Sequence, residues 1–460
     1  QIAPDYDYAL GLLAFAKMHA CDWKNLDVIN RRIIDGVHTG KRSTKTLAMT
    51  AITDDPYVHL LCAKIFAQHF FPAREQVWQG EIYKHKKIKV AYVSPDLREH
   101  PVGHLTAGLF EHHDREKFET IAISLGIDDN SRIRQRMEKA FDLFIDARQI
   151  PSFDIARRLR EMEVDILVDM AGYTADSRTD LFAFRPTPIQ VNYLGYSSTL
   201  GLDYFDYIVA DRHIIPEGFR NAYSEKVVYL PETYLPTDSE LDFQAVKTTR
   251  KDHGLPEDSF VFCSFNHDYK ISQEMFTIWM RLLNSVPASV LWLMKLNESA
   301  ERNLRQEAAK HGITEDRIIF ASRVPAIEDH LARYRLADLF IDTFPCNAHS
   351  TTSDVLRAGL PMVTCRGRAF AARVAGGLLE LVGLPELITE NYEDYEKLTL
   401  KLATDRELLT SCKNRLAANL EQLQPFSTDR YCRHLEAAYL QMWQRYQAGQ
   451  APDHIAVSQA

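Results

Sequence analysis

Four short stretches of the 460-residue chain carry residues whose types and spacing suit the handling of an anionic leaving group. The first, Ile341 to Cys365, passes from an apolar strand through a turn with Pro345 into the hydroxylic run Ser350–Ser353. Ser and Thr at a helix start cap free backbone N–H groups, and those groups with the helix dipole bind anions. His349 precedes this helix, where its ring could hydrogen-bond a phosphate or sugar oxygen. A well-capped crossover helix is the alternative interpretation.

The second stretch contains Lys270, which directly follows an apolar strand and precedes a helix. An ammonium group at such a strand exit can meet a departing phosphate as a point charge. Stabilising the departing charge is usually the largest catalytic contribution to group transfer. A solvated lysine at a strand exit is the alternative interpretation of the same pattern.

The third stretch, Ser94 to Leu105, places His100 and His104 four residues apart at a strand–loop–helix junction. Such a pair could be a metal-binding face or a catalytic loop. Pro101 and Gly103 would interrupt a helix between the two rings, which favours the catalytic loop. We expect His104 to pack against its neighbours.

The fourth stretch, Pro325 to Arg333, begins a helix after a strand and carries His330. Two further segments, residues 169–178 and 190–201, are glycine-bearing strand exits, where backbone can approach a ligand closely. Charges on a helix surface and ordinary β–α turns are the alternative interpretations.

Short apolar strands alternate with amphipathic helices in two successive series, which predicts two mostly parallel, doubly wound sheets of the α/β class. The first series begins at Ile88 and the second at Phe260, with a polar linker over 231–250. Ligands of such sheets lie beyond the carboxyl ends of the strands. This pattern predicts two Rossmann-like domains that face a cleft, an arrangement found in glycosyltransferase-B enzymes, although two such sheets also occur in many other enzymes.

The predicted domains are a helical region over 1–82, an N-terminal catalytic domain over 87–240 and a C-terminal nucleotide-binding domain over 251–446. Within the helical region we expect residues 41–51 to form a loop. Residues 391–446 read as helical throughout and would close the last domain.

Composition narrows the class of protein. The formal charge of -9 argues against a general nucleic-acid binder. Seven scattered cysteines without a C-x-x-C pair fit reduced thiols and no structural zinc, and predict a cytoplasmic location. No apolar run reaches the roughly 18–20 residues of a membrane span, so we expect no membrane partner.

The run Cys346–Gly359 resembles the diphosphate site of the O-GlcNAc transferase family, whose motif runs Cys-Asn-Gly-His-Thr-Thr-Gly-x-Asp-Val-Leu-x-Ala-Gly. Ala348, Ser350 and Thr352 depart from that motif. The other three stretches resemble further family motifs in the same order, and the likeness covers residues 87–446. The segment Cys21-Asp-Trp23 also matches a helical piece of the family, so we expect a tetratricopeptide-like N-terminal region with further repeats ahead of Gln1.

The resemblance implies an inverting, metal-independent transfer of N-acetylglucosamine from UDP-GlcNAc to Ser or Thr hydroxyls of a protein. It implies that Lys270 meets the leaving diphosphate and that His100 lies beside sugar and acceptor as the general base. The implied nucleotide and diphosphate contacts are His267, Lys270, Pro325, Ile327, His330, Arg333, His349, Ser350, Thr351, Thr352 and Asp354. The implied sugar pocket consists of Leu194, Gly195 and His349.

Two departures from the family leave the donor open. Ile327 replaces a lysine that contacts ribose and base, and His267 replaces a glutamine that contacts the nucleotide. A SPINDLY-type protein O-fucosyltransferase that uses GDP-fucose is therefore the rival enzyme. A nucleotide-binding module that captures peptides without transfer is the alternative from another class.

We expect no cofactor and no metal. Metal-dependent sugar transferases usually hold their ion with a carboxylate pair. The one D-x-D of this sequence, Asp5-Tyr-Asp7, lies in the N-terminal helical region, away from the motifs. The expected partners are a UDP-sugar donor and an acceptor protein or peptide, with no nucleic acid.

Overall fold

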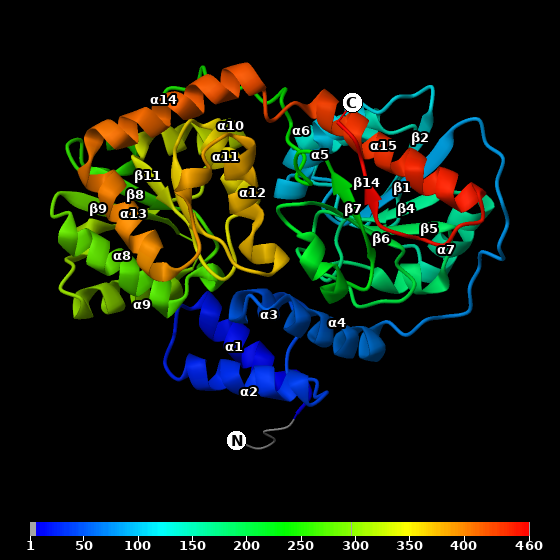
Figure 1. Cartoon of the computed structure of the whole chain (residues 1–460), viewed down its shortest axis with the longest axis horizontal. Helices are drawn as coiled ribbons and strands as arrows, with labels where there is room; N and C mark the ends of the chain where they lie inside the picture. The colour runs from blue at the N-terminus through cyan, green and yellow to red at the C-terminus, as the bar shows by residue number, and fades with distance from the viewer. Residues whose placement is uncertain (1–5, 296, 460) are drawn as a thin grey trace. The chain divides into compact units, whose positions relative to one another are not determined.

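The computed structural model describes residues 6–295 and 297–459, and Asp5 of the D-x-D lies outside them. The chain forms two compact units, each built on one parallel sheet with helices on both of its faces (Figure 1). Unit 1 holds the chain up to Thr39 together with Ser43–Asp55 and Leu241–Pro425. Unit 2 holds Gly40–Arg42, Pro56–Glu240 and the chain from Phe426 onward.

The sheet of unit 2 has eight strands in the order β14-β7-β6-β5-β4-β1-β2-β3. Its strands are β1 (Ile88–Ser94), β2 (Phe118–Ser124), β3 (Leu143–Asp146), β4 (Ile166–Asp169), β5 (Ile189–Asn192), β6 (Tyr207–Asp211), β7 (Lys226–Leu230) and β14 (Ile455–Ala456). Its helices are α4 (Pro56–Phe70), α5 (Pro101–Glu111), α6 (Arg132–Ala140), α7 (Ser152–Glu161) and α15 (Thr428–Gln447), with 3-10 turns η1 (Thr179–Phe184) and η2 (Glu217–Ala222).

The sheet of unit 1 has six strands in the order β10-β9-β8-β11-β12-β13. They are β8 (Phe260–Ser264), β9 (Ser289–Met294), β10 (Ile318–Ala321), β11 (Leu339–Ile341), β12 (Met362–Cys365) and β13 (Ile388–Thr389). The α-helices are α1 (Ala9–His19), α2 (Leu26–His38), α3 (Thr46–Ile52), α8 (Gln273–Ser285), α9 (Glu298–Lys310), α10 (Ile327–Arg333), α11 (Ser350–Arg357), α12 (Val374–Leu381), α13 (Tyr392–Thr404) and α14 (Arg406–Leu423). The 3-10 turns are η3 (Lys251–His253), η4 (Asp268–Lys270), η5 (Glu315–Arg317), η6 (Tyr334–Leu336), η7 (Phe370–Ala372) and η8 (Pro385–Leu387).

Local sequence explains where several helices begin. Ser131, Ser272 and Asn297 each accept a hydrogen bond from a backbone N–H in the first turn of the helix that follows. Such caps are worth about 1 kcal/mol each. The central strands β1 and β8 are apolar on both faces and buried, as strands covered by helices on both sides must be.

The predicted fold class is confirmed, because both sheets are parallel and doubly wound. One local prediction was wrong: residues 41–51, expected as a loop, contain helix α3. The segment is rich in polar residues, but Ala48 and Met49 of α3 are buried, and α3 packs against α1. Tertiary burial therefore overrides the weak local signal.

The compact units group the chain differently from the predicted domains. The expected helical region 1–82 is divided, since α1 to α3 belong to unit 1 and α4 belongs to unit 2. The reason lies in their contacts: α1 packs on η4, while α4 packs on η2 of the other sheet. Likewise α15 joins unit 2 although it follows the helices of unit 1, because it packs on α5 and β7.

Candidate functional site

The loop after β11 is organised around a buried carboxylate, that of Asp342. Its Oδ1 accepts hydrogen bonds from Asn266 Nδ2 at 2.9 Å and from the N–H groups of Thr343 and Ala348 at 2.8 Å. Its Oδ2 accepts one from Thr364 Oγ1 at 2.6 Å. Four donors on one side chain fix the path of the chain from β11 to α11.

Asn347 holds the second half of this loop. Its Nδ2 donates to the carbonyls of Thr343 at 2.8 Å and Cys365 at 3.2 Å, and its N–H donates to Ala371. Its own carbonyl accepts a hydrogen bond of 2.7 Å from Lys270 Nζ. The ammonium group of Lys270, which we predicted to stabilise the leaving group, is therefore hydrogen-bonded to the backbone just before α11.

Helix α11 begins differently from the predicted hydroxyl cap. The residue at the N-cap position is His349, and no side chain caps the helix. Thr352 Oγ1 donates back to the Ala348 carbonyl at 2.9 Å instead of accepting from the first turn. Among the described residues, the N–H groups of Ser350 and Thr351 have no acceptor, so both are available to an anion.

His349 is half-buried and interacts electrostatically with Lys270. Burial, reinforced by that ammonium group, lowers the pKa of His349 to about 3. The ring is therefore neutral at physiological pH, and its Nε2 donates to the Ala371 carbonyl at 3.2 Å. Since a carbonyl only accepts, the proton of this tautomer resides on Nε2.

His330 and Arg333 form one assembly with Phe265. Arg333 is 1% exposed, and its guanidinium stacks on the Phe265 ring at 4.6 Å and donates to the Ser322 carbonyl at 2.8 Å. A guanidinium nitrogen also lies 2.5 Å from His330 Nδ1. Because an arginine can only donate, His330 accepts at Nδ1. Arg333 thus lies behind His330 and orients its half-buried ring.

Asp354 lies on α11, four residues after Ser350. Burial raises its pKa to about 7, and Arg357 offsets only part of that effect. Pro325 is exposed and Ile327 half-buried, at the chain entry into α10. These three residues are all in unit 1 with Lys270 and α11.

His267 is half-exposed and precedes the η4 turn that ends in Lys270. Its Nδ1 lies 2.8 Å from Asp268 Oδ1. Both imidazoles, His267 and His19, lower the pKa of Asp268 to about 2 against the effect of burial. The predicted nucleotide contact is therefore part of a second polar cluster on η4.

His100 is the N-cap of α5. Its Nδ1 accepts a hydrogen bond of 3.2 Å from the Val102 N–H, so the proton of the neutral ring resides on Nε2. Burial, with the nearby Arg98 and His104, lowers its pKa to about 4. His104 packs as expected, with Nε2 2.6 Å from Glu99 Oε1. The neutral His100 ring therefore offers a hydrogen-bond donor, Nε2–H, whereas the resemblance implied a general base at this position.

Leu194 and Gly195 lie in the exit loop of β5. Leu194 adopts a φ of 73°, and a Cβ on Gly195 would meet the Met170 carbonyl at 2.1 Å. The neighbouring exit of β4 is held by Asp169, whose Oδ1 accepts from the N–H groups of Ala171 and Gly172 at 2.9 Å. Only glycine allows these two exits to approach each other this closely.

Eleven of the predicted residues lie in unit 1 and three in unit 2. Unit 1 holds His267, Lys270, Pro325, Ile327, His330, Arg333, His349, Ser350, Thr351, Thr352 and Asp354, while unit 2 holds His100, Leu194 and Gly195. Sequence reasoning missed the supporting residues Asp342, Asn266 and Asn347. A carboxylate at the very end of an apolar strand was the signal available for Asp342.

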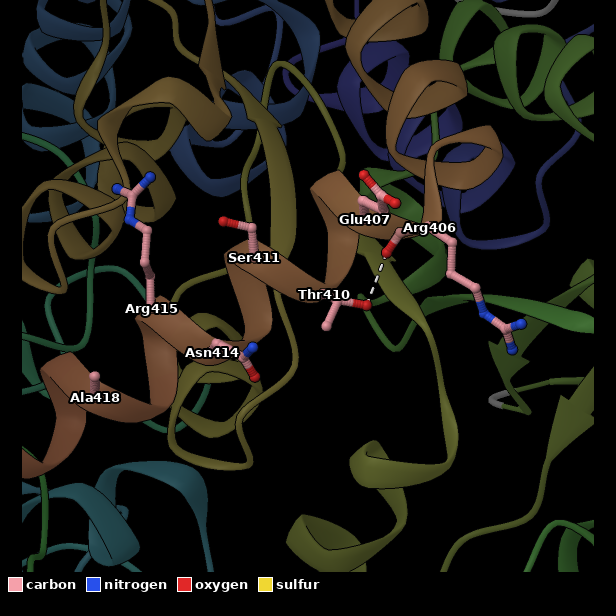
Figure 2. Close-up of a pocket in the computed structure, with 7 residues that line it drawn as sticks. All are labelled: Arg406, Glu407, Thr410, Ser411, Asn414, Arg415 and Ala418. Carbon is pink, nitrogen blue, oxygen red and sulfur yellow. Dashed lines mark hydrogen bonds between the residues drawn. The ribbon is translucent and has the colours of Figure 1, made fainter.

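A shallow hollow on α14 lies apart from these residues. Figure 2 shows its lining side chains, which come from successive turns of this one helix, with Thr410 donating to the Arg406 carbonyl at 2.7 Å. Its lining residues are Arg406, Glu407, Thr410, Ser411, Asn414, Arg415 and Ala418. None of them is a predicted site residue. Because all of them lie on α14, the hollow is a groove along the surface of this one helix.

Comparison with known proteins identifies relatives for the whole region that carries these residues. The family described as glycosyl transferase family 41 matches residues 59–247 and 235–435. The probable UDP-N-acetylglucosamine–peptide N-acetylglucosaminyltransferase SEC of Arabidopsis thaliana is 37% identical over 378 residues, which are 81% of this chain and 39% of that protein. The probable UDP-N-acetylglucosamine–peptide N-acetylglucosaminyltransferase SPINDLY of Oryza sativa subsp. japonica is 30% identical over 82% of this chain and 41% of that protein.

A solved structure agrees with these sequence matches. A mutant of the Thermobaculum terrenum O-GlcNAc transferase superposes with a TM-score of 0.80 and 25% identity, over 96% of this chain and 85% of that one. The chain spans about two fifths of the length of the curated relatives it matches. The resemblance read from the motifs is confirmed by both kinds of comparison. None of the described helices combines the length and apolar character needed to cross a membrane.

Proposed function

Because the chain belongs to glycosyl transferase family 41, we propose that it is an inverting, metal-independent transferase that moves N-acetylglucosamine from UDP-GlcNAc to protein Ser or Thr hydroxyls. The observation that carries this proposal is the Lys270 ammonium group, which lies on the Asn347 carbonyl at the entrance to an uncapped helix. The donor and the peptide acceptor are supported by the name of the Arabidopsis relative.

In this reaction the acceptor oxygen forms a bond to the anomeric carbon while the bond from that carbon to the β-phosphate oxygen breaks. The electron pair leaves with UDP, and the hydroxyl proton passes to an oxygen of the departing diphosphate, because the neutral His100 ring has no free basic nitrogen. Lys270 and the N–H groups of Ser350 and Thr351 supply positive charge and donors for the departing diphosphate. These groups serve the leaving group without a divalent ion.

The nucleoside is assigned to His330 and Asp354. The ring of His330 is fixed by the buried Arg333, so it can stack on or bond the nucleotide with little loss of side-chain freedom. Asp354, when ionised, accepts hydrogen bonds from ribose hydroxyls. Arg333 acts as a positioning residue, because its guanidinium is buried beneath His330.

His100 is assigned to the acceptor side as a hydrogen-bond donor through Nε2. Its Nδ1 lone pair is used by the Val102 N–H, which leaves no basic nitrogen on the neutral ring. This assignment replaces the general base inferred from the resemblance. The Leu194–Gly195 loop, where only glycine fits, is assigned to the sugar.

The test is calorimetric titration with UDP, UDP-GlcNAc and GDP-fucose in the presence of a chelator. We expect UDP and UDP-GlcNAc to bind and GDP-fucose to give no response. Binding of GDP-fucose alone would replace the proposed donor and assign the chain to protein O-fucosylation. The absence of any response would contradict a transferase function.

Replacing the ammonium group tests the leaving-group assignment. Lys270→Met should reduce transfer to a peptide by roughly 100- to 1,000-fold, as expected for loss of a group that stabilises developing charge. Lys310→Met is the matched control, because Lys310 is exposed and pairs with Glu307 on the surface of α9. Full turnover of Lys270→Met would reject the assignment.

A further inference from the structure

The turn that carries Lys270 also carries a cluster of imidazole and carboxylate groups. His19 is the last residue of α1, while His267 and Asp268 lie at η4, and all three belong to unit 1. His19 Nδ1 lies 3.3 Å and His267 Nδ1 2.8 Å from the same Asp268 Oδ1. The three potential ligand atoms lie within 4.8 Å of one another.

We propose that His19, His267 and Asp268 form a binding site for a divalent transition-metal ion of the zinc type. Two imidazoles and one carboxylate are ligands that zinc, cobalt and nickel accept. The groups assigned above to the diphosphate, Lys270 and the start of α11, are not among the ligands of this site and need no ion, whereas His267 is also a predicted nucleotide contact. The site also contradicts our sequence-based expectation that the chain binds no metal.

The distances suit such an ion. Tetrahedral bonds of about 2.0–2.1 Å place neighbouring ligand atoms about 3.3 Å apart. The separation between His19 Nδ1 and Asp268 Oδ1 already has this value. The His267 nitrogen must move outward by about 0.5 Å, and its half-exposed ring is free to rotate that far. A fourth position then remains for water.

The carboxylate is held in place by its surroundings. Asn297 Nδ2 donates both to Asp268 Oδ2 and to the His19 carbonyl, at 2.9 Å for the latter. Oδ1 faces the two imidazoles and also accepts the Tyr269 N–H at 3.2 Å. Metal-binding carboxylates are typically hydrogen-bonded in this way by a second layer of residues.

Two further hydrogen bonds fix the chain that follows α1 to unit 1. Trp23 Nε1 donates to the Ile271 carbonyl at 3.1 Å, and Asn303 Nδ2 donates to the Ala20 carbonyl at 2.8 Å. The ligands therefore come from two segments that are already docked. His19 ends its helix, where the partial negative charge of the carbonyls favours a cation.

The rings around the cluster partly shield it from water. Phe15 packs against His19 at 4.6 Å, and Tyr269 packs against both imidazoles at 5.2 Å. The side chains of His19 and His267 remain 35% and 50% exposed, which leaves an entry path for an ion. The hydrophobic shell around a metal site controls solvent access and the local dielectric constant.

A second cluster of ligand residues in the described chain lacks these properties. His113, Cys432 and Glu436 are buried in unit 2. His113 already bonds Tyr92 through Nε2 at 2.8 Å and Glu436 through Nδ1 at 2.9 Å. Both ring nitrogens of His113 are therefore already hydrogen-bonded, and the burial of all three residues leaves an ion no path to them.

The proposal is tested by titrating the metal-free protein with zinc chloride and, separately, with cobalt chloride, whose visible spectrum reports tetrahedral coordination. We expect one ion per chain, released by a chelator. His19→Ala and His267→Ala should each weaken binding at least tenfold. His38→Ala should leave it unchanged, because His38 is likewise the exposed last residue of a helix, α2, outside the cluster.

Two results would overturn the proposal: absence of stoichiometric binding, or binding that His19→Ala and His267→Ala leave unchanged. Far-ultraviolet circular dichroism of each variant shows whether it is folded. Asp268→Glu, which keeps the carboxylate but displaces it, is the second variant and should alter the cobalt spectrum. His19 is not among the predicted nucleotide contacts, so His19→Ala should leave UDP binding unchanged, and failure here is distinguishable from failure of the proposed function.

Discussion

His100 and Lys270 were both expected to act at the reacting atoms, yet their surroundings prepare them for different tasks. Lys270 keeps an ammonium group in place on a carbonyl. His100 has one nitrogen committed to a helix N-terminus and a pKa of about 4. A base needs a free lone pair and a pKa near the working pH. His100 has neither, so the two residues should respond differently to substitution.

We expect His100→Asn to retain a substantial part of the transfer activity that His100→Ala loses. Asparagine can accept the Val102 N–H as an N-cap and still offer an N–H donor, whereas alanine does neither. His100→Ala should also lose about 1 kcal/mol of stability with the cap. Peptide transfer rates and melting temperatures of both variants provide the measurement. Equal inactivation of the two variants would restore the general-base assignment.

Asp354 should make donor affinity depend on pH. With a pKa of about 7, its carboxyl is mostly neutral at pH 6 and mostly ionised at pH 8. If the ionised form binds ribose, affinity for UDP-GlcNAc should rise roughly tenfold between those values. UDP-GlcNAc is the suitable ligand because its diphosphate does not titrate in this range. Asp354→Asn should give a flat profile, and a wild-type profile without a rise would contradict the assignment.

The Asp354 carboxyl should also make the stability of the fold depend on pH, but here the protonated form is the favourable one. Its pKa is raised above the unfolded value, so its contribution to stability is full at low pH and is lost as pH rises through about 7. Asp354→Asn should therefore stabilise the protein by roughly 1–4 kcal/mol at pH 8 and have no such effect near pH 4. Chemical unfolding at the two pH values measures this. A variant that is less stable at pH 8 would contradict it.

At the scale of elements, the passage from β11 to α11 depends on Asp342 rather than on the hydroxylic run that marks it in the sequence. Asp342→Ala should cost about 2–4 kcal/mol, because the buried N–H groups of Thr343 and Ala348 lose their acceptor and Asn266 loses one of its two. Asp342→Asn keeps Oδ1, and Thr364 can turn its hydroxyl to accept from the new amide. We expect the asparagine variant to retain most of the stability.

Unfolding free energies of both variants, with UDP titrations, test this explanation. Alanine at 342 should weaken UDP binding as well, since the N–H groups of Ser350 and Thr351 lie at the end of this loop. If Asp342→Ala binds UDP normally, the loop does not position the helix start. Ser350→Ala, which keeps the backbone N–H, is the control that should bind UDP with little loss.

Elements with strong periodicity were predictable, and supporting contacts were not. β1 begins at Ile88 and β8 at Phe260, as predicted, because apolar runs are local signals. The short edge strands β13 and β14 carry two residues each and no such signal. The motifs identified Lys270 and His349, but the tautomer of His100 depends on a hydrogen bond that only the fold reveals.

At the scale of the whole molecule, the chain returns to unit 2 after completing unit 1. Helix α15 closes unit 2: Tyr431 donates to the Tyr234 carbonyl at 2.6 Å, and Glu436 pairs with the buried His113. Leu435, Tyr439 and Trp443 bury its apolar face. A chain of this order cannot be divided by cutting it once between the two sheets.

A chain that ends at Pro425 should therefore lose unit 2 and keep unit 1. Helix α15 contacts β5, β7 and α5, and the usual net stability of a domain is only about 5–15 kcal/mol, so we expect unit 2 to unfold when these contacts are lost. Hydrogen exchange should show β1 and β4 unprotected and β8 and β11 protected. Because the eleven predicted nucleotide contacts all lie in unit 1, UDP should still bind while transfer is lost. A chain that ends at Gln450 lacks only β14 and its flanks and should keep both units. If the shorter chain protects β1 as well as the longer one does, α15 is dispensable, and the division of the chain into these two units is not the one that governs its stability.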